Sequence, residues 1–167
     1  MAKQENFSAE EWTALRLAPT LVSAGMSAAE PSGLFSSIKE ASAGMQAMLE
    51  AVKSGGSLEL MAALAADRSI PGMPDPKSLL GEGDRAQQMA NFKQAVLERV
   101  RAAGALAGQK ASPEEAMAYR QMIAGVAERT ATASKEGGFL GFGGTRVSSA
   151  EQSFLAEVRS ALGLPPA

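Results

Sequence analysis

Apolar residues recur at spacings of three and four along most of the chain, which is the pattern of amphipathic α-helices. The first such face consists of Trp12, Leu15, Pro19, Val22, Met26 and Ala29. Comparable faces follow over residues 38–52, 57–67, 89–103, 116–130 and 154–162. No segment requires the alternation that is typical of a strand. The pattern therefore predicts an all-α fold, a bundle of about five to seven helices.

The starts of several helices carry a capping box, in which a Ser side chain accepts from a backbone N–H and a Glu three residues later accepts from the Ser N–H. The pairs are Ser8 and Glu11, Ser37 and Glu40, Ser112 and Glu115, and Ser148 and Glu151. Phe7 and Trp12 form a hydrophobic staple at the first box, and Asp84 is positioned to cap a long helix. Because proline lacks an N–H, we expect a kink or break near Ala18 and Pro19.

A segment rich in Pro and Gly lies near the middle of the chain. Residues 70–76, Ile-Pro-Gly-Met-Pro-Asp-Pro, oppose regular structure. We therefore expect one domain over residues 1–167, with halves 8–68 and 84–164 joined by a linker at 69–83.

The two ends of the chain share an order of features. Residues 8–53 and 112–162 each contain a capped helix, a loop with Gly and acidic residues, and a Ser-Ser pair that opens a second capped helix. This order suggests two similar helix-loop-helix hairpins packed together.

Composition limits the chemistry that the chain can perform. The 167 residues include no Cys and no His, which excludes disulfides, Ser-His triads and metal sites built on those ligands. A formal net charge of -2 provides no basic field for nucleic acid, so nucleic acid is not an expected partner. No catalytic constellation remains, and we expect neither an enzyme nor a cofactor.

Neither a targeting segment nor a membrane span is predicted. The first residues lack the apolar core of a signal peptide, and no segment reaches the roughly 18 to 20 apolar residues of a transmembrane helix. We expect a cytoplasmic location.

A glycine-rich stretch interrupts the helical pattern between the last two helices. Five glycines at positions 137, 138, 141, 143 and 144 surround Phe139, Leu140 and Phe142. One interpretation is a helix C-cap at Gly137 followed by a linker whose apolar side chains fill the core. The other is a recognition loop with the three apolar residues as interaction candidates. A phosphate cradle is disfavoured, because no strand precedes the loop.

Two segments resemble the tellurite-resistance TerB-like helical domains, in which an Ala-rich helix leads through an acidic, Gly-containing loop into a Ser-x-x-Glu helix start. They are Ala28-Ala29-Glu30-Pro31-Ser32-Gly33 with Ser37 and Glu40, and Ala133-Ser134-Lys135-Glu136-Gly137 with Ser148 and Glu151, leading into Phe154-Leu155. The resemblance covers the two ends of the chain and implies a stress-response accessory role. The family's loops are suspected of binding metal, which makes Glu30 and Glu136 the candidate ligands. The loops of that family typically carry Asp-Gly, however, whereas this chain has Glu30-Pro31 and Lys135-Glu136 at those places.

The sequence thus favours a protein-interaction module that uses the loop 137–144 to bind an unknown protein partner or a second copy of itself. The alternative is a carboxylate-based site for a divalent metal. Several glutamates that could contribute to such a site, including Glu40 and Glu151, already have capping roles, so we expect no tightly bound metal.

Overall fold

A computed structural model of the chain describes residues 2–29, 58–69, 71–72, 74–133 and 147–166. Over these residues the fold is all-α and contains no strand, as the apolar pattern predicts. The described helices are α1 (Ala9–Ala29), α3 (Glu59–Ala66), α4 (Pro76–Leu80), α5 (Arg85–Lys110), α6 (Pro113–Ala133) and α7 (Ser149–Ala161), preceded by a 3-10 turn at Gln4–Asn6. No helix in these ranges has the length and hydropathy that crossing a bilayer would need.

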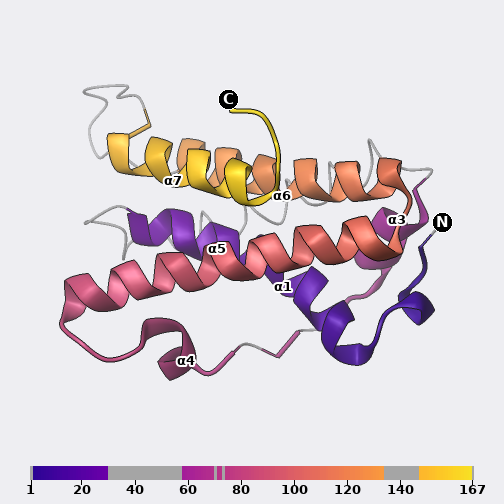
Figure 1. Cartoon of the computed structure of the whole chain (residues 1–167), viewed down its shortest axis with the longest axis horizontal. Coiled ribbons are helices and arrows are strands. Elements are labelled where there is room, and N and C mark those ends of the chain that lie inside the picture. Colours follow the sequence, from indigo (N-terminus) through magenta and orange to yellow (C-terminus); the bar gives the residue numbers. More distant parts are fainter. Residues whose placement is uncertain (1, 30–57, 70, 73, 134–146, 167) are drawn as a thin grey trace.

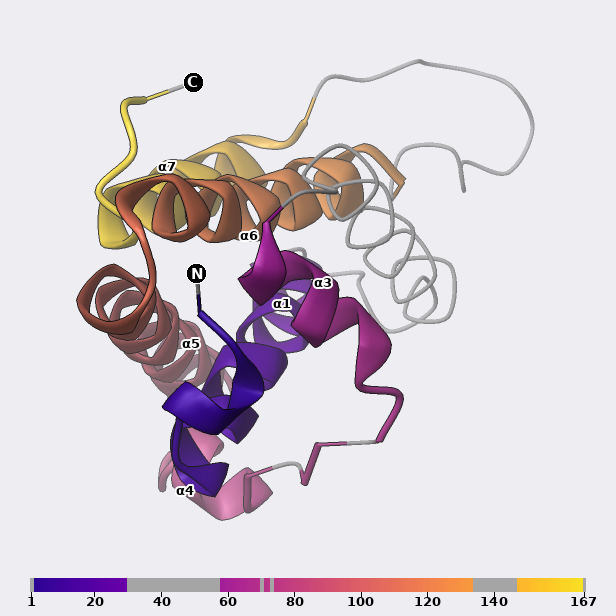
Figure 2. The ribbon, with the colours of Figure 1, turned by 90° about the vertical axis from the view of Figure 1, so that its right-hand side faces the viewer.

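The four longest of these helices form two layers. α6 and α7 lie over α1 and α5 in both ribbon views (Figure 1, Figure 2). α1 packs against each of the other three, whereas α3 packs against α6 and α4 against α5. Only Ala111 and Ser112 separate α5 from α6, so the chain reverses direction there and the two helices run antiparallel.

A glycine lets α1 approach its neighbours closely. A Cβ atom placed on Gly25 would lie 2.7 Å from Cζ of Phe154 in α7 and 3.3 Å from Cγ1 of Val96 in α5. The Phe154 side chain is only 2% exposed, so its ring occupies the space that a larger residue at position 25 would need. The meeting of three helices at this point therefore depends on the absence of a side chain.

Of the kink or break expected near Ala18 and Pro19, the break does not occur, because α1 is continuous from Ala9 to Ala29. Pro19 has no N–H to donate to the carbonyl of Leu15 four residues earlier. The hydroxyl of Tyr119 in α6 donates to that carbonyl instead, at 2.8 Å. Burial raises the pKa of Tyr119, so the phenol keeps its proton near neutral pH and can donate this hydrogen bond.

Three of the predicted capping boxes are confirmed. Ser8 and Glu11 exchange hydrogen bonds of 2.7 and 3.1 Å, and equivalent pairs begin α6 and α7. Asp84 caps α5 by accepting from the N–H of Gln87 at 2.9 Å. The fourth box, at Ser37 and Glu40, lies outside the described residues.

The predicted linker at 69–83 contains a short helix that the sequence analysis missed. Asp75 caps α4 by accepting from the N–H of Lys77, and a proline occupies the first helical position. At α3 the buried side chains are Leu60, Met61 and Leu64, whereas Leu58 and Ala65 are half-buried.

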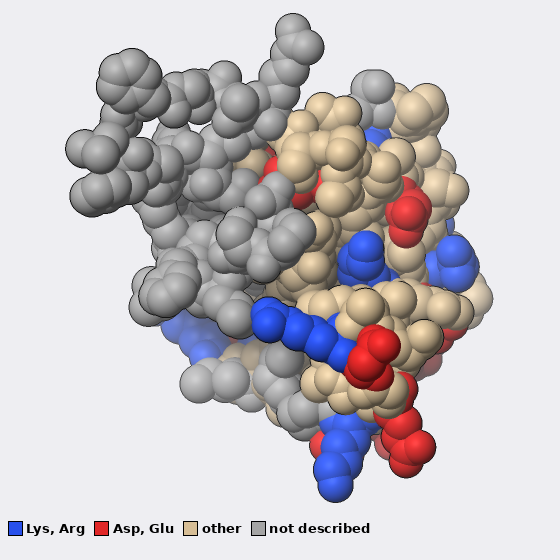
Figure 3. Space-filling view, turned by 90° about the vertical axis from the view of Figure 1, so that its left-hand side faces the viewer, with Lys and Arg blue, Asp and Glu red and all other residues tan. Residues whose placement is uncertain are grey.

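Charged side chains of both signs are interspersed over the end of the molecule shown in Figure 3. The described surface there carries no continuous patch of one sign.

Candidate functional site

The residues that the sequence analysis proposed as functional all lie outside the described residues. They are the interaction candidates Phe139, Leu140 and Phe142 and the alternative metal ligands Glu30 and Glu136. Among the residues that are described, no group of three or more Asp and Glu side chains is arranged to hold a metal ion.

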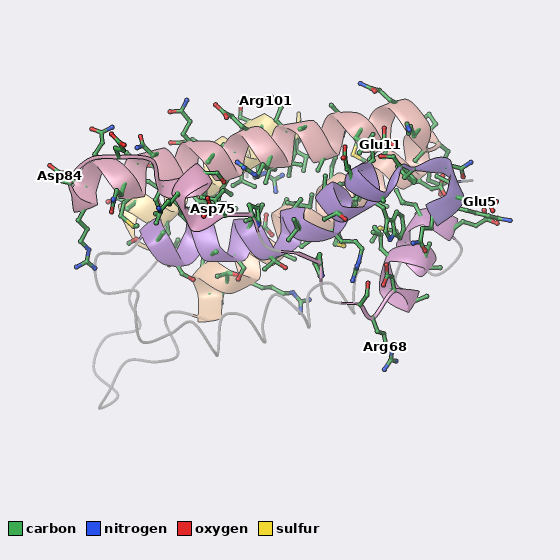
Figure 4. The ribbon with its side chains drawn as sticks, turned by 90° about the horizontal axis from the view of Figure 1, so that it is seen from below. Glu5, Glu11, Arg68, Asp75, Asp84 and Arg101 are labelled. Carbon is green, nitrogen blue, oxygen red and sulfur yellow. The ribbon has the colours of Figure 1, made fainter. Side chains whose placement is uncertain are left out.

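The described part of the chain does contain an open groove of about 430 Å³ along the seam between α1 and α5. Seen from below, α1 and α5 lie side by side, and α4 lies over one part of their seam (Figure 4). The groove is lined mainly by small and apolar side chains: Ala9, Glu10, Thr13, Ala14, Leu17, Leu21, Arg99 and Ala102. Its volume falls within the range of about 300 to 1,000 Å³ that is typical of binding sites.

The groove exists because α1 has a second apolar stripe. At about 100° per residue, Ala14, Leu17 and Leu21 lie on the side of the helix opposite the face that contains Trp12 and Val22. The buried leucines form the floor of the groove, and the exposed Ala14 contributes a low wall. Across the seam, α5 contributes the small side chain of Ala102, so the groove stays shallow and open.

Two contacts fix how α1 and α5 are aligned. Nζ of Lys110, near the end of α5, lies 2.5 Å from Oε2 of Glu11, near the start of α1. Val96 lies next to Gly25, towards the other end of α1. Arg99 is eleven residues before Lys110, so at 1.5 Å per residue it lies about 16 Å along α5 from the Lys110 end. The groove therefore has an acidic end at Glu10 and a basic end at Arg99.

Neither of these end charges is neutralised by a partner among the described residues. The ion pairs found there join Arg16 to Asp67, Lys110 to Glu11 and Arg159 to Glu128. Arg99 is half-buried and donates from Nη1 to the carbonyl of Ala95 at 3.3 Å, whereas Glu10 is exposed. Both charges are therefore available to an occupant of the groove.

A buried carboxylate outside the groove joins three parts of the chain. The Glu115 side chain is 1% exposed and accepts from the backbone N–H groups of Ser112, Ala2 and Leu60 at 3.0 to 3.2 Å. Burial raises the pKa of Glu115. The hydrogen bonds from these donors and from the Ser112 hydroxyl together lower the pKa by more than burial raises it, so it lies below its ordinary value. Its oxygens satisfy backbone donors at the starts of α3 and α6, which makes its role structural.

A second polar cluster ties the end of α3 to α1. Asp67 accepts from the Ser69 hydroxyl at 2.6 Å and from Nε1 of Trp12 at 2.9 Å, and it pairs with Arg16 at 3.2 Å. These hydrogen bonds, with a smaller contribution from Arg16, lower the pKa of Asp67 to about 2. The carboxylate is thus held ionised by structural partners.

The groove brings together no acid, base and nucleophile in an arrangement suited to catalysis. Its one hydroxyl, on Thr13, donates to the carbonyl of Ala9 at 2.7 Å. What the arrangement can do is bind an apolar surface and orient it between two opposite charges. The sequence did not predict this site, because the strongest apolar stripe of α1 lies on the opposite side of the helix. The second stripe at Ala14, Leu17 and Leu21 could have indicated it.

No protein-family model, curated protein or solved structure matches the chain. The resemblance to TerB-like domains stays a prediction.

Proposed function

We propose that the chain is a protein-interaction module and that the groove between α1 and α5 is a docking surface for an α-helix of a partner protein. The observation that carries this proposal is the groove itself, an open apolar channel between two antiparallel helices. Helix-in-groove docking is a common mode of peptide recognition, in which an amphipathic helix buries its apolar face.

The shape of the groove favours a helix over other occupants. The side chains of Ala9, Ala14 and Ala102 are small enough for the backbone of a neighbouring helix to approach closely. Recognition by strand addition would require a free sheet edge, and the described residues contain no strand. An open groove lined mainly by small and apolar side chains also suits an elongated apolar occupant better than an enclosed small molecule.

Large apolar side chains are rarely exposed on the described surface. Among described residues, Met117 in α6 is the large hydrophobic side chain that is clearly exposed, at 43%. A single exposed apolar residue is normal for a folded protein and needs no partner. The loop 137–144 stays a second proposed contact of the same module.

Site-specific photo-cross-linking in cells tests the proposal. A photoreactive amino acid at Ala14, in the groove, should give a discrete adduct with another protein. The matched control is the same substitution at Ala156, an exposed alanine of α7 that does not line the groove. Ala102→Trp should fill the groove and abolish the Ala14 adduct without lowering the melting temperature, because position 102 is exposed. The proposal is wrong if position 14 gives no adduct, or gives the same adducts as position 156.

A further inference from the structure

The groove carries information about the chemistry of its occupant. We infer that it selects an amphipathic helix of about three turns that places a Lys or Arg against Glu10 and an Asp or Glu against Arg99. This inference rests on the proposed function, because it specifies the partner of the same groove.

The length of the recognised segment follows from the separation of the two charges. Glu10 and Arg99 lie at opposite ends of the groove, about 16 Å apart along the helix axes, which is the rise of eleven helical residues. Residues eleven apart return to nearly the same face after three turns. One face of a partner helix can therefore present a basic and an acidic residue to the two ends at the same time.

The apolar floor sets what lies between those charges. Leu17 and Leu21 are buried under the groove, and Ala14 and Ala102 border it. Large apolar side chains on the partner, four and seven residues after its first charge, would lie over this floor on the same face as both charges. The low alanine walls leave room for leucine or methionine at these positions.

The two end charges also set the direction of the partner. The dipoles of α1 and α5 oppose each other beside the seam, and Glu10 and Arg99 are the charged side chains that line the groove. A three-turn helix places its positive N-terminus near Glu10 and its negative C-terminus near Arg99. This direction is also the one in which an N-terminal base and a C-terminal acid meet their partners. The preferred sequence therefore has the base first and the acid eleven residues later.

The test compares two synthetic peptides held helical by a covalent staple and labelled for fluorescence anisotropy. Both have leucines at the fourth and seventh positions after the first charge. One begins with Lys and has Glu eleven residues later, and the other has Lys at both positions, so that no direction of binding satisfies both ends of the groove. We expect the Lys–Glu peptide to bind about fivefold more tightly, since one of its two exposed ion pairs becomes a repulsive pair in the other peptide. The difference should shrink as salt is raised to about 1 M.

Variants of the protein complete the experiment. Arg99→Glu makes both ends of the groove acidic and should invert the preference, and Ala102→Trp should abolish binding of both peptides. Equal binding of the two peptides to the unaltered protein, or a preference that survives Arg99→Glu, would overturn the inference while helix docking stands. Failure of both peptides to bind, or binding that Ala102→Trp leaves intact, would instead overturn the proposed function.

Discussion

At the scale of single residues, the bond between Tyr119 and Leu15 explains how α1 continues through a proline. Pro19 leaves the Leu15 carbonyl without its usual helical donor, and the Tyr119 hydroxyl replaces that donor from a different helix. The apolar faces predicted over residues 12–29 and 116–130 include Pro19 and Tyr119. The sequence does not show that the Tyr119 hydroxyl replaces the donor missing at Pro19, because the two residues are 100 positions apart in the chain.

Replacing Tyr119 with Phe should lower the free energy of unfolding by about 1 to 3 kcal/mol, because the buried Leu15 carbonyl loses its donor. Chemical denaturation measures this change. The penalty should be smaller in a Pro19→Ala background, where the N–H of residue 19 can donate to Leu15. Equal penalties in both backgrounds would show that the two residues are energetically independent.

The two structural carboxylates predict acid sensitivity. The ordinary pKa values are 4.5 for Glu115 and 3.8 for Asp67, and folding lowers both, in the second case to about 2. The folded protein therefore binds fewer protons than the unfolded chain, so these groups stabilise it fully above their ordinary pKa values. This contribution is lost as pH falls through the folded values.

The denaturation midpoint should accordingly be stable near neutral pH and decline once the pH is below about 4.5. Asp67→Asn should flatten the part of this decline that lies between about pH 4 and pH 2. A variant whose midpoint falls as steeply as that of the unaltered protein would rule out Asp67 as a source of the pH dependence.

At the scale of helices, the contact at Gly25 makes the packing of α1 against α5 and α7 sensitive to one methyl group. Gly25→Ala would place a Cβ atom 2.7 Å from the buried ring of Phe154, and overpacking of this kind costs about 1 to 3 kcal/mol. The gain in helix propensity, about 1 kcal/mol, offsets only part of this cost. Thermal melting should therefore show net destabilisation.

A second substitution tests whether steric conflict is the cause of this destabilisation. Phe154→Leu shortens the side chain that lies against Gly25. Phe154→Leu should therefore lower the free energy of unfolding less in the Gly25→Ala variant than in the unaltered protein. Strictly additive effects would indicate that the ring and the new methyl group do not compete for space.

The capping box of α6 gives a prediction at the same scale. Ser112→Ala removes the hydroxyl that accepts from the Glu115 N–H at 3.2 Å, and should lower stability by about 0.5 to 2 kcal/mol. The matched variant Ser8→Ala removes the corresponding cap of α1 at a more exposed site. An effect near zero at Ser112 would mean that its hydroxyl contributes nothing as a cap.

Local sequence predicted the elements better than it predicted the site. Capping boxes and the stripes of α1 and α6 were recoverable because their causes lie within a few residues. The short helix α4 was not predicted from the sequence, although Asp75 followed by a proline is a typical helix start. The second stripe of α1 could have indicated an apolar surface. The pairing of this stripe with α5 and the partner of Leu15 could not be predicted, because each depends on how α1 is aligned with a helix far along the chain.

At the scale of the whole molecule, the proposed contact through the loop 137–144 is tested by replacing Phe139 and Phe142 with Ser. If the loop binds a partner, the melting temperature should hardly change, while self-association or partner capture is lost. Sedimentation and pull-down measure the binding. A core-filling loop predicts the reverse, since loss of one buried Phe typically costs about 3 to 5 kcal/mol. A large drop in melting temperature with binding intact would therefore exclude the recognition role.

The carboxylate of Glu115 has a consequence for the order in which the molecule opens. It holds backbone amides of Leu60 and Ser112, which are far apart in the chain, through one side chain. Displacing that side chain exposes both amides at once. Their hydrogen-exchange rates should therefore respond together when Glu115 is replaced by Gln, even though they belong to different helices. The contact between Leu60 and Glu115 closes a long loop, so it should form late in folding, after the helices that it joins, whereas the contact with Ser112 is local.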